Sequence, residues 1–132
     1  MPMLGILFDI DDLGEALYGY AAYQILFHAI DTLELAGCSI SDGDTAATLA
    51  GHANHYCIAI ASPDPSKLVR LKSVLTTCDA KGLLPPKSRF LEDEDVAREP
   101  LVLAGSFTSN GELVGCTTGW VREAWLKSRK RM

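Results

Sequence analysis

Three carboxylates, Asp9, Asp11 and Asp12, follow the first apolar segment of the chain. The carboxyl end of a strand is where ligands bind in open α/β sheets, and clustered carboxylates there can hold Mg²⁺ and so organise a phosphate. Asp9 and Asp11 therefore predict, as one alternative, a small Mg²⁺-dependent hydrolase or phosphoryl-transfer enzyme. In the structural alternative, Asp12 caps the next helix, and the other two carboxylates are solvated or favour its positive end.

A second set of polar residues follows helical spacing. Gln24, His28 and Asp31 stand at i, i+4 and i+7 and share one face of a predicted helix. A pairing with Asp31 would fix the tautomer of His28, which could then act as a general base in a pocket. Tyr20 and its neighbouring tyrosines could line that pocket or an interface. We therefore take Tyr20, Gln24, His28 and Asp31 as candidate ligand-binding residues; in the alternative, the polar line faces solvent and the tyrosines fill the core.

The segment GHANHYC contains a third candidate set, His52, His55 and Cys57, with spacings that occur among zinc ligands. A tetrahedral site needs a fourth ligand, for which Cys38 and Asp44 are nearest in sequence. Structural zinc sites usually have paired short spacings at both ends, and only one end is present here. The pattern favours two exposed histidines beside a strand and one buried cysteine.

The element that must position most of these groups is a long helix over residues 12–37. Asp12 and Glu15 have capping-box spacing, and Gly37 stands where a left-handed C-terminal residue is expected. Its apolar residues spread around most of the cylinder and leave only a narrow polar line. Such a helix is central, covered on more than one side by its own domain or by a partner chain.

Hydrophobic patterning and turn residues predict the remaining elements. The Asp64-Pro65 pair and Gly82 delimit one helix with a clear apolar face, and Asn110-Gly111 predicts a hairpin turn. The expected elements are strands over 3–9, 56–62, 101–107 and 112–118, helices over 45–53, 65–82 and 120–130, a turn over 39–44, and a solvated loop or short helical turn over 88–99.

This element order predicts an α+β fold in one globular domain, residues 1–132. We expect a small mixed sheet of about four strands, with parallel neighbours from the first crossovers and a C-terminal antiparallel hairpin. One long central helix and two or three shorter helices would pack on it.

Composition narrows the classes of function. The net charge of −5 argues against a nucleic-acid partner, because phosphate contacts need a basic face. The apolar stretches are too short or too interrupted by polar residues to cross a membrane, and the N-terminus lacks the basic region of a signal peptide. The four cysteines form no CxxC pair, so we expect a cytoplasmic protein with reduced, buried thiols and no cofactor.

The leading hypothesis is a non-enzymatic binding or interaction module that forms a homodimer. Its motivation is the apolar surplus of residues 12–37, which exceeds what one thin sheet can bury and which a second copy could cover. The two enzyme readings above, at Asp9 and Asp11 or at His28 and Asp31, are the alternatives.

Overall fold

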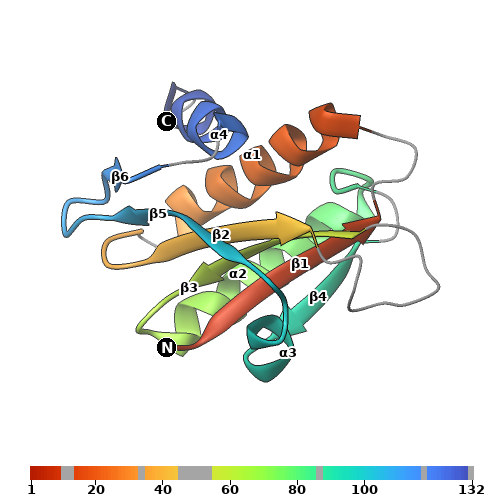
Figure 1. Cartoon of the computed structure of the whole chain (residues 1–132), viewed down its shortest axis with the longest axis horizontal. Helices are drawn as coiled ribbons and strands as arrows, with labels where there is room; N and C mark the ends of the chain where they lie inside the picture. The colour runs from red at the N-terminus through yellow and green to blue at the C-terminus, as the bar shows by residue number, and fades with distance from the viewer. Residues whose placement is uncertain (10–13, 33–34, 45–54, 86–87, 117–118, 131–132) are drawn as a thin grey trace.

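In a computed structural model of the chain, the described residues are 1–9, 14–32, 35–44, 55–85, 88–116 and 119–130, and the side chains at 9, 14–18, 30–32 and 44 also lie outside the description. The described elements are strands and helices of a mixed chain (Figure 1). They are β1 (Met3–Asp9), α1 (Gly14–Thr32), β2 (Ser39–Asp44), β3 (His55–Ala61), α2 (Pro65–Ala80), β4 (Arg89–Glu92), α3 (Glu94–Ala97), β5 (Val102–Phe107), β6 (Leu113–Val114) and α4 (Gly119–Lys130). In this element order β2 is followed directly by β3, and β5 by β6.

The strands within the described residues form one six-stranded sheet in the order β4-β1-β3-β2-β5-β6. Every neighbouring pair is antiparallel. Strands β1 and β2 run parallel to each other, but β3 lies between them, and β1 likewise separates β3 from β4. The first six elements follow one another along the chain in the order β-α-β-β-α-β, which is the order of the ferredoxin-like split βαβ arrangement.

The α+β class is confirmed, but the expected mixed sheet of about four strands is wrong in two respects. The sheet has six strands, and the parallel neighbours expected from the first crossovers are absent from its described pairings. The segment SISDGD, expected to be a turn because of its Ser, Asp and Gly content, is strand β2, which pairs with β3 on one side and β5 on the other. Pairing on both sides outweighs its low strand propensity.

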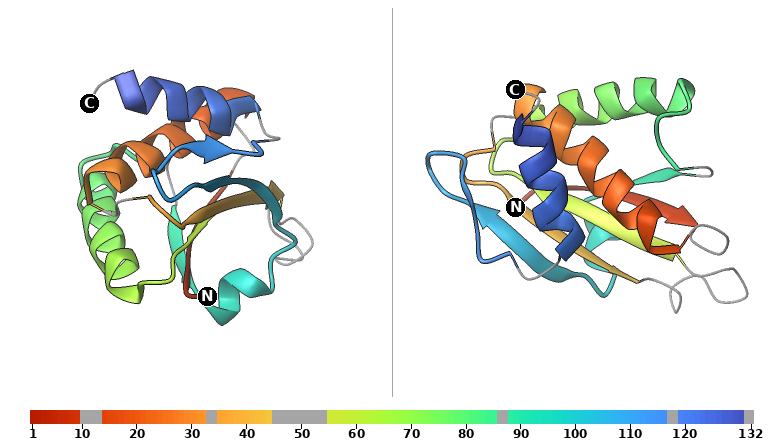
Figure 2. Two further views of the ribbon diagram at one scale, coloured as in Figure 1. Left: turned by 90° about the vertical axis from the view of Figure 1, so that its left-hand side faces the viewer. Right: turned by 90° about the horizontal axis from the view of Figure 1, so that it is seen from above.

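The expected long central helix is also not found. Helix α1 has 19 residues, ends at Thr32 rather than near Gly37, and shares its side of the sheet with α2 and α4 (Figures 1 and 2). Gly37 has the positive φ of 80° that was expected, but it lies in the turn that leads into β2. The Asp12 cap and the helix over 45–53 lie outside the described residues.

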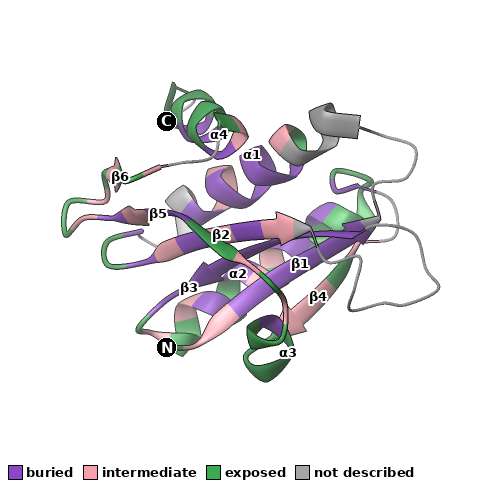
Figure 3. Ribbon diagram, viewed as in Figure 1, coloured by how far each residue is buried: buried purple, intermediate pink, exposed green. Residues whose placement is uncertain are grey.

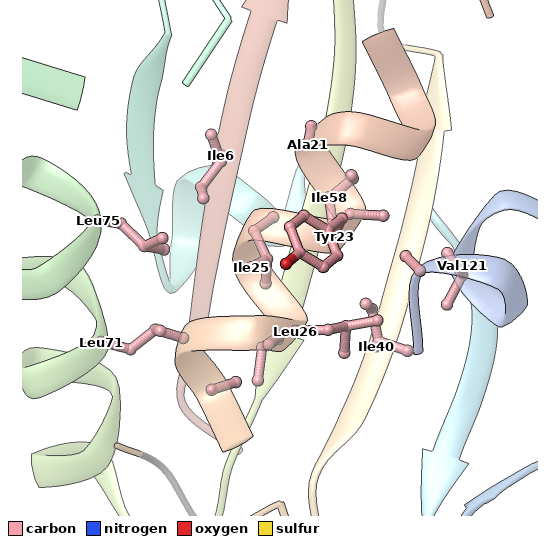
Figure 4. Close-up of a cluster of buried hydrophobic side chains, with 14 of the residues drawn as sticks. Ile6, Ala21, Tyr23, Ile25, Leu26, Ile40, Ile58, Leu71, Leu75 and Val121 are labelled. Carbon is pink, nitrogen blue, oxygen red and sulfur yellow. The ribbon is translucent and has the colours of Figure 1, made fainter. Parts of the chain in front are cut away.

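The apolar residues of α1 are covered by the chain itself. The sheet, α2 and α4 all contact this helix, and its side chains Tyr23, Ile25 and Leu26 pack among Ile40 and Val121 in one cluster (Figure 4). Ala21, Ala22 and Ala29 are buried as well. Among the α1 side chains that the structure describes, Tyr20 is the one large hydrophobic residue left exposed, so most of the apolar surplus that motivated a homodimer is covered within this part of the chain.

The predicted ends of helix α2 and the predicted hairpin turn are confirmed. Asp64 accepts a hydrogen bond from the backbone N–H of Ser66 at 3.0 Å and caps α2, and Gly82 follows the helix with φ of 73°. Between β5 and β6, Gly111 has φ of 78° and its N–H donates to the Thr108 carbonyl at 2.9 Å. The returning strand is shorter than the expected 112–118, because β6 contains only two residues.

The second face of the sheet, away from α1 and α2, is covered by the crossover segment, residues 93–101, which includes α3 and leads from β4 to β5 (Figures 1 and 2). A Cβ added to Gly5 of β1 would lie 3.0 Å from Val96, and one added to Gly43 of β2 would lie 2.9 Å from the Pro100 carbonyl oxygen. Two glycines therefore let this segment approach the sheet closely. Beneath it β1 and β3 are largely buried, whereas the outer side of α3 is exposed (Figure 3).

Replacing Gly43 with alanine tests this close packing. We expect Gly43→Ala to lower the free energy of unfolding by about 1–3 kcal/mol, because its Cβ would press on backbone that cannot rotate away. Urea denaturation of both proteins measures the change. The control is Gly119→Ala at the start of α4, where an added Cβ meets nothing within 4 Å. Equal stability of the two variants would contradict the contact.

Candidate ligand-binding site

A groove of about 240 Å³ lies between α1 and α4. Its walls carry aromatic and charged side chains: Tyr20 and Tyr23 come from α1, and Trp120, Glu123 and Lys127 come from α4. The two helices meet closely at Gly19, where an added Cβ would lie 3.8 Å from Trp120 Cβ. The groove thus has the composition of a small-molecule site, with aromatic walls and a few polar groups.

A buried polar chain fixes one wall of the groove. Trp120 donates its indole N–H to the Tyr56 hydroxyl at 3.1 Å, and Tyr56 donates in turn to the Asp42 carboxylate. Asp42 is 6% exposed and Tyr56 is 4% exposed, so both are removed from solvent. Because the residues come from β2, β3 and α4, this chain ties the first turn of α4 to the sheet.

Aromatic stacking and a cation hold the other wall. The Tyr23 ring stacks on Phe27 with centroids 5.7 Å apart, and Lys127 Nζ lies 4.8 Å from the Tyr23 centroid. This ring therefore stabilises the ammonium by a cation–π contact. Among the described residues, no carboxylate forms an ion pair with Lys127, so its charge is available to an anionic ligand.

Of the four residues expected to bind a ligand, the structure describes the side chains of Tyr20, Gln24 and His28, and these three do not line one pocket. Tyr20 lines the groove and is 40% exposed, whereas Gln24 is buried. His28 is half-buried on the side of α1 that faces α2, with its Nε2 atom 3.1 Å from Cys78 Sγ. The side chain of Asp31 lies outside the described residues, so its pairing with His28 stays a prediction.

The candidate metal ligands are only partly described. Asp9 is the register partner of His55 at the end of β1, but its side chain, like Asp11 and His52, lies outside the description. His55 was expected to be exposed and is in fact buried, next to Cys57 on the same face of β3. Within the described part of the chain, no three His, Cys, Asp or Glu side chains form a ready metal site.

The four cysteines all lie among the described residues and show no disulfide with one another, and three of them are buried, as expected for structural thiols. Burial, with a smaller contribution from the nearby Glu99 carboxylate, raises the pKa of Cys57 from 9.0 to about 12. Burial also raises the pKa of Cys78, against a smaller opposing effect of Lys81. Both thiols are therefore protonated at neutral pH, which makes them poor nucleophiles without further activation.

Sequence reasoning missed Asp42 and Tyr56 as parts of the site. A signal was present, because Ile40 and Asp42 are two residues apart and would share one face of a strand. Residues 56–62, which include Tyr56, were recognised as a strand. The Ser and Gly residues beside them are typical of a turn, and a turn was therefore predicted over 39–44. The hydrogen bond of Trp120 to Tyr56, 64 positions away, has no local signature in the sequence.

No protein family model, no curated protein and no solved structure matches this chain. None of the described helices is long and apolar enough to cross a membrane. The site is therefore interpreted from its own geometry.

Removing one hydroxyl tests the polar chain behind the groove. We expect Tyr56→Phe to destabilise the fold by about 1–3 kcal/mol, because it deletes a buried hydrogen bond to a carboxylate. Chemical denaturation gives the energy, and the near-ultraviolet circular dichroism of Trp120 reports its release. The matched variant Tyr20→Phe removes an exposed hydroxyl and should leave both signals unchanged. A Tyr56→Phe protein as stable as the parent would contradict a structural role for the chain.

Proposed function

We propose that the chain is a non-enzymatic binding module that takes a small aromatic carboxylic acid in the groove between α1 and α4. The supporting observation is Lys127, whose ammonium lies over the Tyr23 ring inside an aromatic groove and forms no ion pair with a carboxylate of the described residues. A planar ring can stack on Tyr20 or Trp120 while its carboxylate pairs with that ammonium.

The groove is prepared for binding because its aromatic walls are held before a ligand arrives. Trp120 is tied to the sheet through Tyr56, and Tyr23 is held by Phe27 and Lys127. A preorganised wall lowers the entropic cost of binding, which helps a site of this small volume. Glu123 at the rim disfavours ligands with a second negative charge near the same wall.

Binding is tested with a panel of small aromatic acids, followed by Trp fluorescence and ligand-observed NMR. Tyr20→Ala should raise the Kd about 3- to 10-fold through lost stacking, and Lys127→Gln about 10-fold or more through lost charge pairing. Lys67→Gln, on the distant helix α2, is the matched charge control. The proposal fails if no acid binds, or if Lys127→Gln binds as tightly as the Lys67→Gln control.

A second candidate function is protein interaction, including the homodimer. It rests on exposed apolar residues at the β5–β6 end of the sheet, where Val102 is 66%, Leu103 53% and Val114 49% exposed. Leu103 and Val114 lie on the second face, since their register partners Ser41 and Ser106 do. Clusters of this kind are common at protein interfaces.

Sedimentation at micromolar concentration tests the dimer. If this surface joins two copies, Leu103→Asp should convert the dimer to a monomer, because a carboxylate would be desolvated in the interface. Val69→Asp, an equally apolar and 68% exposed position on α2, should leave the association state unchanged. A parent chain that sediments as a monomer would rule out the homodimer.

A further inference from the structure

A second pocket, of about 460 Å³, lies between α4 and the hairpin that joins β5 to β6 (Figure 1). The groove between α1 and α4 is lined by one flank of α4, residues 120, 123, 124 and 127. The pocket is lined by the other flank, residues 122, 125, 126 and 129. Both sets follow helical spacing, and at 3.6 residues per turn they point to opposite sides of the helix. The pocket is therefore separate from the groove, and its volume suits a small molecule.

Positive charge exceeds negative charge in this pocket. Two arginines, Arg122 and Arg129, and one carboxylate, Glu112, line it, which leaves one net positive charge in a chain whose net charge is −5. The rest of the lining is uncharged: Leu113, Gly115, Cys116, Trp125 and Leu126. A cationic pocket on an acidic protein concentrates anions at that place.

Arg129 is restrained before a ligand arrives. Its Nη1 atom donates to Glu112 Oε2 at 2.6 Å, and its guanidinium carbon lies 5.9 Å from the Trp125 ring centroid. Trp125 is in turn fixed by an edge contact with Phe107, with the centroids 5.3 Å apart. A guanidinium has five N–H donors, so the donors that Glu112 does not use remain available to a ligand.

The charge of Arg122 is not compensated. Its side chain is exposed and forms no ion pair or hydrogen bond with another described residue. It precedes Arg129 by seven residues, or about 10 Å along the helix axis, and Leu126 lies between the two. A ligand whose anionic group pairs with Arg122 can therefore extend over Leu126 toward the Arg129–Glu112 pair, which offers both donors and an acceptor.

We propose that this pocket binds the phosphate monoester of a small hydroxylated compound. The phosphate pairs with Arg122, and the hydroxyl groups of the ligand bind Arg129 and Glu112. A guanidinium can bind a phosphate through two parallel hydrogen bonds, and the phosphate carries a charge of about −1.5 to −2 at pH 7, more than one carboxylate does.

Two features of the lining limit the choice of ligand. Trp125 is only 8% exposed, so the pocket offers little aromatic surface for stacking, in contrast to the groove between α1 and α4. Glu112 disfavours a ligand with a second acidic group at the far end, because the two carboxylates would repel each other. A hydroxylated body with a single phosphate satisfies both limits.

Calorimetric titration of the full chain with glycerol phosphate, ribose phosphate and glucose phosphate tests the site. We expect at least one ester to bind about 10-fold or more tightly than inorganic phosphate or its own parent alcohol. Arg122→Gln should raise the Kd of that ester about 10-fold or more, because the charged hydrogen bonds are lost. Arg70→Gln, which removes another exposed arginine on the distant helix α2, is the matched control and should bind as the parent does.

Measurements on the unmodified chain locate the ligand. The backbone amide signals of Gly115 and Cys116 should shift as the ester is added, whereas those of Gly19 and Tyr20 in the groove should not. Binding should weaken as the pH falls below about 6, because the phosphate loses its second charge while arginine keeps its own.

Three results would overturn the proposal. The first is that no ester in the panel binds, and the second is that inorganic phosphate binds as tightly as the best ester, since charge alone would then explain the binding. The third is that Arg122→Gln and Arg70→Gln have the same Kd. A loss of ester binding in Lys127→Gln, with Arg122→Gln unaffected, would place the ester in the groove and would equally exclude this pocket.

Discussion

The position of β3 between β1 and β2 is the constraint on which the rest of the structure depends. All seven residues of this strand pair with β1, residues 56–61 also pair with β2, and all seven are buried. Its alternation sends Tyr56, Ile58 and Ile60 toward α1, α2 and α4, and sends His55 and Cys57 toward the crossover segment. A one-residue slip would exchange the two sets and place ionisable groups in the main core. The register of one strand therefore decides which polar groups lie behind the groove and which lie beneath the crossover segment.

The two faces of that strand differ in how they accommodate polarity. On the helical side, the buried carboxylate of Asp42 accepts a hydrogen bond from the Tyr56 hydroxyl. That hydroxyl in turn accepts a hydrogen bond from the indole N–H of Trp120 in the groove wall. On the other side, the polar atoms of His55 and Glu99 end without partners. The first arrangement is a finished structural network that presents an aromatic surface. The second leaves two buried polar atoms without hydrogen bonds, which costs stability.

Helix α2 could be predicted closely from the sequence because its limits are set locally, by Asp64 at one end and Gly82 at the other. The hairpin turn at Asn110-Gly111 followed for the same reason. Strand β2 could not, because what stabilises it is pairing with segments that its own residues do not reveal. The groove was half predictable: Tyr20 was recognised, but its opposite wall comes from α4, about a hundred residues later in the chain. Such contacts depend on strand order, which no short segment encodes.

The pairing of β1 has a consequence for synthesis of the chain. Both of its neighbours lie much later in the chain, since β3 begins at His55 and β4 begins at Arg89. During synthesis, the edge of β1 toward β3 therefore stays open until residues 55–61 have been made, and its edge toward β4 until residues 89–92 have been made. Closing contacts over such separations slows folding and leaves the nascent strand open to aggregation. The interval before β3 and β4 are both made is thus when this strand is most open to association with other chains.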